Sequence, residues 1–143
     1  MSERPRAVLL DTCAIIWLST GELKGGILDL LIHAGAAGGV FVSPVSAWDI
    51  GMLATSSAGP MRVDFLPDPV RWWERVVSQP MLRIAPLTAA AAIEASRLPQ
   101  PLHNDPGDRL LIATARELNI PVVTRDRKIL DYASLGHVQA LDC

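Results

Sequence analysis

Residues 103–126 read HNDPGDRLLIATARELNIPVVTRD and place three aspartates around one helix and one strand. The NDPGD start carries the Asp and Pro that favour the first turn of a helix, and LLIATAREL supplies apolar side chains at helical spacing. Pro121 ends the helical pattern, and the β-branched run at 122–124 predicts a buried strand. Asp126 therefore follows the carboxyl end of that strand, where open α/β sheets bind ligands.

The aspartates of this stretch also have purely structural explanations. Asp105 and Asp108 lie where a helix cap is expected, and Asp126 lies where a turn is expected. Caps and turns often use Asp, so for a single aspartate these explanations are sufficient. A functional interpretation requires that other parts of the chain bring further acids to the same place.

Strands and helices alternate along the rest of the chain. A short apolar run at 7–10 predicts an interior strand that ends at Asp11, and a second strand at 40–42 precedes a helix that contains Asp49. This alternation predicts an α/β domain, residues 1–143, with a central, mostly parallel sheet of four to five strands flanked by helices in three layers. The other expected elements are helices at 13–18, 26–36, 47–54, 70–77 and 89–97, a short helix or turn at 129–135, strands at 82–85 and 137–141, and a mobile loop at 55–69.

The composition is that of a globular protein, since 50% of the 143 residues are hydrophobic and 20% are charged. No window of about 18 apolar residues suggests a membrane span, so we expect a cytoplasmic protein with no membrane contact. The formal charge of −2 argues against binding nucleic acid through many phosphate contacts. The two cysteines lack the spacing of a disulfide framework or a zinc site, and Cys13 is expected in the core. Trp72 and Trp73 fit either the core or a partner surface.

Four acids have positional reasons to meet at one edge of the predicted sheet: Asp11, Asp49, Asp108 and Asp126. Gathered carboxylates repel one another and raise one another's pKa unless a divalent cation or a shared proton compensates. An oxygen ligand set without His or Cys suits Mg²⁺ or Mn²⁺. Such ions activate water and polarise phosphoryl groups, which favours phosphodiester cleavage.

Three blocks of the sequence resemble the signature blocks of PIN-domain ribonucleases, in particular the VapC-type toxins of bacterial toxin–antitoxin modules. The blocks are LLDTCAIIWL, VSPVSAWDIG and HNDPGDRLLIATARELNIPVVTRDRKI, and the likeness spans nearly the whole chain. The resemblance implies a PIN-like fold and assigns the metal to Asp11, Asp108 and Asp126. Asp49 stands where the family usually has Glu. Asp is shorter by one C–C bond, roughly 1.5 Å, so its ligand contact is expected to be water-mediated or lost unless the helix lies closer.

The resemblance also implies roles for residues beside the four acids. Thr12 and Thr124 match flanking hydroxyl positions, and Asp105 is expected to cap the helix or support the neighbouring ligands. His103 is typical of the third block and is expected to be a structural hydrogen-bonding residue rather than a general base. Arg109 and Arg125 are expected either to contact RNA phosphates or to pair with the neighbouring carboxylates.

The resemblance implies an Mg²⁺- or Mn²⁺-dependent endoribonuclease, a hydrolase that acts on RNA, forms a homodimer and is neutralised by a cognate antitoxin protein. The alternative is a catalytically weak PIN-fold module that binds protein or RNA, which the Asp49 departure and the modest charge favour. A phosphoacceptor receiver-like domain fits poorly, because Asp11 has no paired acid beside it and no Lys follows the last strand in the required place.

Overall fold

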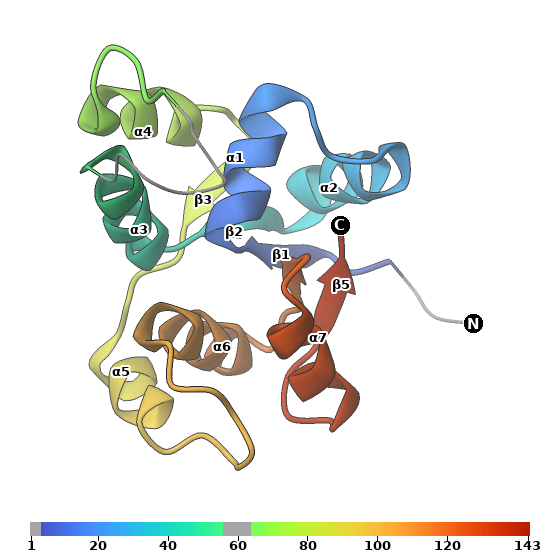
Figure 1. The fold of residues 1–143 in the computed structure, drawn as a ribbon. Coiled ribbons are helices and arrows are strands. Elements are labelled where there is room, and N and C mark those ends of the chain that lie inside the picture. The colour runs from blue at the N-terminus through green and yellow to red at the C-terminus, as the bar shows by residue number, and fades with distance from the viewer. Residues whose placement is uncertain (1–3, 56–63) are drawn as a thin grey trace.

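The computed structural model describes residues 4–55 and 64–143. Within them, five strands form one parallel sheet in the order β3-β2-β1-β4-β5 (Figure 1). The strands are β1 (Ala7–Leu10), β2 (Gly39–Val42), β3 (Leu82–Ile84), β4 (Val122–Thr124) and β5 (Ala140–Asp142). The helices are α1 (Thr12–Thr20), α2 (Gly25–Ala37), α3 (Pro44–Thr55), α4 (Pro69–Val77), α5 (Ala89–Ala95), α6 (Pro106–Leu118) and α7 (Arg127–Ser134). The predicted α/β class is confirmed, and the sheet is entirely parallel.

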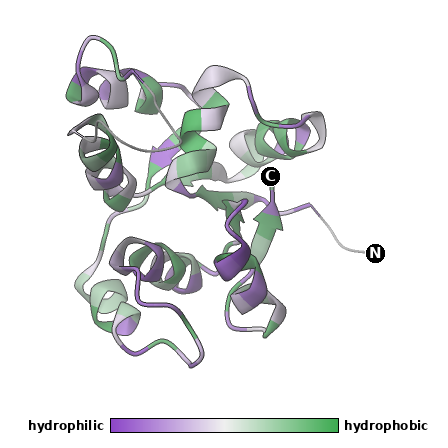
Figure 2. Cartoon of the chain, in the orientation of Figure 1, coloured by the Kyte–Doolittle hydropathy of each residue, from purple (hydrophilic) through white to green (hydrophobic). Residues whose placement is uncertain are grey.

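The helices cover both faces of the sheet, with α1 to α4 on one side and α5 to α7 on the other (Figure 1). Alternate residues of β1 serve the two layers because side chains alternate along a strand. Val8 and Leu10 pack with the α1 to α4 layer, whereas Leu9 packs with α6 and α7. The central strands are accordingly mainly hydrophobic (Figure 2).

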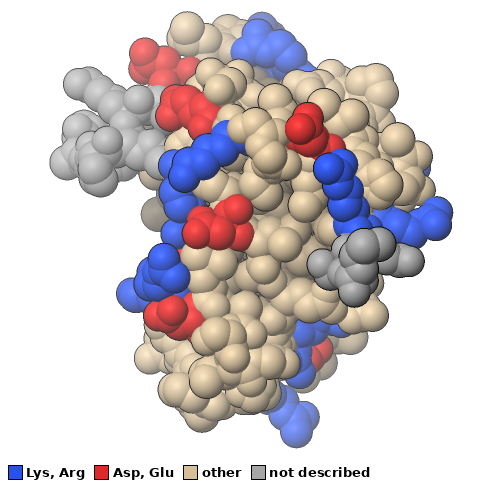
Figure 3. Space-filling model, turned by 90° about the vertical axis from the view of Figure 1, so that its right-hand side faces the viewer, with Lys and Arg blue, Asp and Glu red and all other residues tan. Residues whose placement is uncertain are grey.

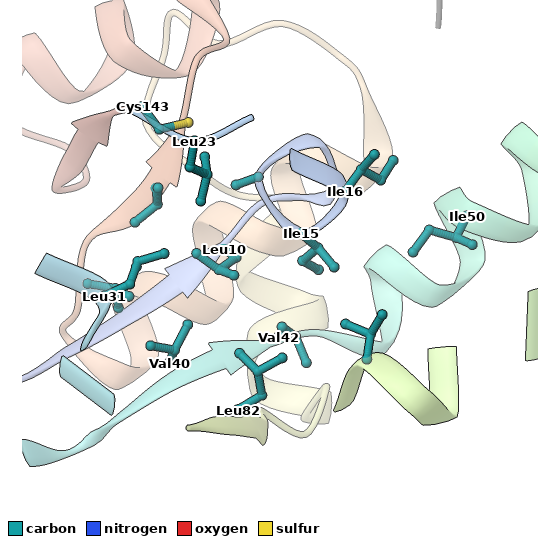
Figure 4. Packing of buried hydrophobic residues seen from close by; sticks show 14 of the residues in the cluster. Leu10, Ile15, Ile16, Leu23, Leu31, Val40, Val42, Ile50, Leu82 and Cys143 are labelled. Atoms are coloured by element: carbon teal, nitrogen blue, oxygen red, sulfur yellow. The ribbon is translucent and has the colours of Figure 1, made fainter. Parts of the chain in front are cut away.

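The larger core lies between the sheet and α1. Figure 4 shows Leu10, Val40 and Leu82 of the strands packed near Ile15 of α1. Trp72 of α4 belongs to this core with an exposed fraction of 6%, and its ring meets Phe65 edge to face at 4.9 Å. Of the two interpretations of the tryptophan pair, the core is therefore the correct one for Trp72.

The pairing of β1 with β4 positions the site. Leu9 and Leu10 pair with Val122 and Val123, so the two strands end side by side. Asp11 and Asp126 follow these ends at the same edge of the sheet. Helix α6 returns the chain to β4 after Asn119, whose left-handed φ of 55° ends the helix while its amide donates to the Ala115 carbonyl.

Several expected boundaries differ from the structure, and α5, for example, ends at Ala95 rather than at residue 97. The last strand was expected from residue 137, but it begins at Ala140, because Ala140 is the first residue that pairs with Val122. The uncertain segment at 129–135 is helix α7, and it starts two residues earlier because Asp126 caps it. Most of the expected mobile loop, residues 56–63, lies outside the described residues. None of the helices in residues 4–55 and 64–143 has the length and apolarity that crossing a bilayer requires.

Candidate metal centre

The four predicted acids line one hollow of about 720 Å³ at the carboxyl ends of β1 and β4. Asp11 caps α1, Asp49 lies within α3, Asp108 lies in the first turn of α6 and Asp126 caps α7. A larger hollow of about 1120 Å³ opens near the amino ends of β1, β4 and β5, and none of the four acids lines it. The acids from four separate elements therefore mark the smaller hollow as the candidate site.

Asp11 is fixed by two hydrogen bonds. Its Oδ1 accepts from the Ala14 amide at 2.8 Å, as an N-cap does, and its Oδ2 accepts from the Thr124 hydroxyl at 2.5 Å. Burial, together with the negative charges of Asp108 and Asp126, raises the pKa of Asp11 to about 6, against the lowering effect of the two hydrogen bonds. Burial prevails because the carboxyl group is almost fully removed from water.

Asp108, Asp126 and His103 form the tightest group. One ligand atom from each lies within 4.8 Å of the other two, and no other such trio of acids, histidines or cysteines occurs among the residues that the structure describes. His103 Nε2 lies 2.7 Å from Asp108 Oδ2, and burial raises the pKa of Asp108. His103 Nδ1 is buried without a partner in the described part of the chain, so the ring proton is assigned to Nε2, which donates to Asp108.

His103 thus has the expected hydrogen-bonding role, and its partner is one of the site acids, Asp108. Its sequence position, five residues before Asp108 on the loop that enters α6, is the signal that could have placed it there. Asp105 has the expected capping role, because its Oδ1 accepts from the Asp108 amide at 3.0 Å.

Asp49 lies where α3 meets the amino end of α6. Its Oδ2 accepts from the Thr12 hydroxyl at 2.7 Å, and its carboxylate is so close to Gly107 that a Cβ there would lie 3.4 Å from Oδ1. Burial raises the pKa of Asp49, and the only acid that adds to this effect is Asp105. Asp49 is therefore at the edge of the group that Asp11, Asp108 and Asp126 form, as expected for a side chain one carbon shorter than Glu.

Two hydroxyl residues hold the acids in place, and a third was missed from the sequence. Thr124 accepts a hydrogen bond from the Asp126 amide at 3.0 Å while donating to Asp11. Thr12 shares a hydrogen bond of 3.0 Å with the Ser46 hydroxyl, which is fully buried. Ser46 precedes Asp49 by three residues, so both lie on one face of α3. That spacing is the signal that could have identified it.

The two arginines differ from each other. Arg109 donates through Nε to the Ala95 carbonyl at 2.9 Å and through Nη1 to the His103 carbonyl at 3.2 Å, so it braces the loop before α6. Arg125 is exposed, donates to the Cys143 carbonyl at 2.6 Å and places its Cζ 3.8 Å from the centre of the Trp17 ring. Neither pairs with a carboxylate within the described residues, so the expected ion pairs are absent there.

Cys13 was expected in the core, and this was wrong. It is partly exposed and lines the hollow beside Asp11. Burial of the thiol, with the surrounding acids, raises the pKa of Cys13 to about 11, so the sulfur stays protonated and is a poor ligand or nucleophile at neutral pH.

The donor set fits a hard divalent cation. Three of the four acids have a raised pKa, and none has a Lys or Arg partner in the described part of the chain. A cation at this position would replace the repulsion among the carboxylates by attraction. Carboxylate oxygens suit Mg²⁺ and Mn²⁺, and His103 acts as the hydrogen-bonding support of Asp108 beside them.

Comparison with known proteins identifies the class. The sequence profile of the PIN domain matches residues 8–135, and the chain belongs to the PIN domain family. No curated protein sequence matches it.

The fold is similar to that of chains in solved toxin–antitoxin complexes. VapBC2 from Rickettsia felis, bound to a promoter DNA fragment, has a TM-score of 0.66 at 12% identity, over 95% of this chain and 98% of that one. DNA-bound VapBC from Salmonella typhimurium has a TM-score of 0.63 at 16% identity, over 95% and 97%. VapBC-5 from Mycobacterium tuberculosis has a TM-score of 0.56 at 19% identity, over 96% and 98%.

Proposed function

We propose that the protein is a VapC-type endoribonuclease that binds Mg²⁺ or Mn²⁺ through Asp11, Asp49, Asp108 and Asp126 and cleaves RNA phosphodiester bonds. One observation carries the proposal. Four acids from four elements line one hollow with no Lys or Arg side chain paired to any of them in the described residues. Such an arrangement is unfavourable for folding alone, and a divalent cation is the simplest compensation.

The residues around the acids prepare the site without the metal. The Ala14 amide and the Thr124 hydroxyl fix both oxygens of Asp11, and His103 holds one oxygen of Asp108. Fixed ligands need little reorganisation when a cation binds. When bound, the cation would supply an activated water and a Lewis acid for the phosphoryl group.

The proposal includes an antitoxin partner, a homodimer and a cytoplasmic location. Trp48 and Met52 support a protein partner, because they lie one turn apart on α3 with exposed fractions of 55% and 57%. Met52 also lines the acidic hollow. A partner segment bound over this apolar side of α3 would cover the entrance to the acids, and the similar solved chains come from complexes with antitoxins.

The first prediction concerns the acids themselves. Asp11→Asn and Asp108→Asn keep the size of the side chain and remove a charge, so each is expected to lower Mn²⁺-dependent cleavage of single-stranded RNA by at least about 100-fold. Asp29→Asn is the matched control, because Asp29 is an exposed acid on α2 that does not line the hollow. A chelator is expected to abolish cleavage by the unmodified protein.

Cleavage rates that stay unchanged in both variants would refute the proposal. Metal binding without any cleavage would instead favour the alternative, a PIN-fold binding module whose Asp49 does not complete the site.

A further inference from the structure

Arg125 is the one Lys or Arg among the described residues that line the acidic hollow. Besides the four acids and Thr12, the hollow is lined by the apolar or weakly polar side chains of Cys13, Trp17, Met52, Leu53 and Leu111, and by Arg125. A polyanionic substrate would be repelled by the carboxylates, and a bound cation offsets only part of this repulsion. Arg125 adds a positive charge to the same hollow, where it can attract the substrate.

Two contacts hold the Arg125 guanidinium in place. Its Cζ lies 3.8 Å from the centre of the Trp17 ring, and its Nε donates to the Cys143 carbonyl at 2.6 Å. The first contact connects Arg125 to α1 and the second to the residue that follows β5. A guanidinium held on an aromatic face and by one hydrogen bond loses little further freedom when it binds a ligand.

The charge of Arg125 is not neutralised by the nearby acids. Although Asp126 is its neighbour in sequence, no ion pair joins Arg125 to a carboxylate in the described residues. Within the same residues only Nε has a hydrogen-bond acceptor, so Nη1 and Nη2 have no protein partner. The four N–H groups of Nη1 and Nη2 lie in a planar fork that can donate to two oxygens of a phosphate.

The face shown in Figure 3 has no broad basic patch that could bind RNA in place of Arg125. There, Lys and Arg side chains are interspersed with Asp and Glu, and much of the area is uncharged. This agrees with the net charge of −2. RNA binding is therefore expected to depend on few phosphate contacts, and each should have a large share in the affinity.

We propose that Arg125, held on the Trp17 ring, binds an RNA phosphate beside the metal-binding acids, and that Trp17 is the residue that positions it. This inference rests on the proposed ribonuclease function and adds which residue holds the substrate. Trp17 acts through Arg125, so a change at Trp17 affects the same step as a change at Arg125.

The test compares Arg125→Ala, Arg125→Lys, Trp17→Phe and Trp17→Leu with Arg127→Ala as the matched control. Arg127 is an exposed arginine two residues further along the chain, and it does not line the hollow. The probe is a single-stranded RNA oligonucleotide. Arg125→Ala is expected to raise KM at least about tenfold with a smaller change in kcat, since a charge-assisted hydrogen bond is lost.

The salt dependence supplies a second readout. The logarithm of the RNA association constant falls with the logarithm of the salt concentration. The magnitude of this slope is expected to decrease by about 1 in Arg125→Ala and to stay the same in Arg125→Lys and Arg127→Ala. Trp17→Leu is expected to raise KM as Arg125→Ala does, whereas Trp17→Phe keeps an aromatic face and recovers most of the loss. The affinity for Mn²⁺ is expected to be unchanged in all of these variants.

A lower melting temperature for Arg125→Ala with an unchanged KM and salt slope would overturn the inference, because Arg125 would then only join α1 to the end of β5. RNA binding is also measured in a chelator, where no cleavage can occur. Arg125-dependent binding by a protein that never cleaves RNA would refute the proposed ribonuclease function alone. Cleavage with no effect at Arg125 would refute this inference alone.

Discussion

Two features of Asp11 favour opposite charge states of its carboxyl group. As the cap of α1 it accepts the Ala14 amide, which an ionised carboxylate does best. As a buried acid near Asp108 and Asp126 it is easier to protonate, and its pKa rises to about 6. In the metal-free protein the second effect prevails, so Asp11 lowers stability wherever it is ionised.

The second prediction is the pH dependence of this effect. The folded pKa of about 6 lies above the ordinary value of 3.8, so the stability contributed by protonated Asp11 is complete below 3.8 and is lost as the pH rises through 6. Asp11→Asn cannot ionise and can still cap α1. In a chelator, the stability of the variant relative to the unmodified protein should therefore increase from pH 5 to pH 8 by about 1.4 kcal/mol, because the rest of the effect already occurs below pH 5.

Urea unfolding at the two pH values measures this difference. Asp29→Asn, on the exposed side of α2, serves as the control and should show no such trend. A difference between Asp11→Asn and the unmodified protein that does not change with pH would contradict the assignment of the raised pKa to Asp11.

Gly107 lies where α3 meets the start of α6. A Cβ there would lie 3.3 Å from Asp105 Oδ1 and 3.4 Å from Asp49 Oδ1. Asp105 and Gly107 belong to the capped start of α6, and Asp49 of α3 lies against them while lining the acidic hollow.

The third prediction follows from this contact. Gly107→Ala is expected to move the Asp105 carboxylate, which accepts from the Asp108 amide, and thereby to lower the affinity for Mn²⁺ severalfold, as changes around metal ligands do. Gly51→Ala is the matched control, because a Cβ at this helical glycine of α3 meets nothing within 4 Å. It should stabilise the protein by about 0.5–1 kcal/mol and leave the Mn²⁺ affinity unchanged. Equal Mn²⁺ affinities for the two variants would contradict the role of the contact.

Most elements could be predicted from the sequence because their patterns are local. The apolar run before Asp11 and the NDPGD start of α6 each fix a boundary through backbone preferences. The start of β5 could not be predicted, because it depends on pairing with Val122, which is distant in sequence. Ser46 and the exposure of Cys13 were missed for the same reason, since both depend on how α1 and α3 pack.

At the scale of the whole molecule, the sheet order explains why distant acids meet. β1 lies at the centre of the sheet with β4 beside it, so the first and the last acid of the site follow neighbouring parallel strands. α3 and α6 approach the same edge from opposite faces of the sheet and add Asp49 and Asp108. The sequence could predict this edge as the site, because strand ends in parallel sheets share one side. How close Asp49 comes to the other acids depends on how α3 packs on α6, which no local sequence pattern shows.

The fourth prediction is made for the whole protein, because a ligand that binds only the folded state stabilises all of it. Mn²⁺ at 100 times its dissociation constant should raise the free energy of unfolding by about 2.7 kcal/mol. Binding should weaken below pH 6, where Asp11 takes up a proton, and should release protons near that pH.

Calorimetric titration of Mn²⁺ into the metal-free protein, in two buffers of different ionisation enthalpy, tests the existence of the metal centre most directly. We expect binding with proton release at pH 6, where Asp11 is about half protonated, and an affinity at least about tenfold lower for Asp108→Asn. Absence of binding at millimolar Mn²⁺, or equal affinities for the two proteins, would show that the four acids do not form a metal centre.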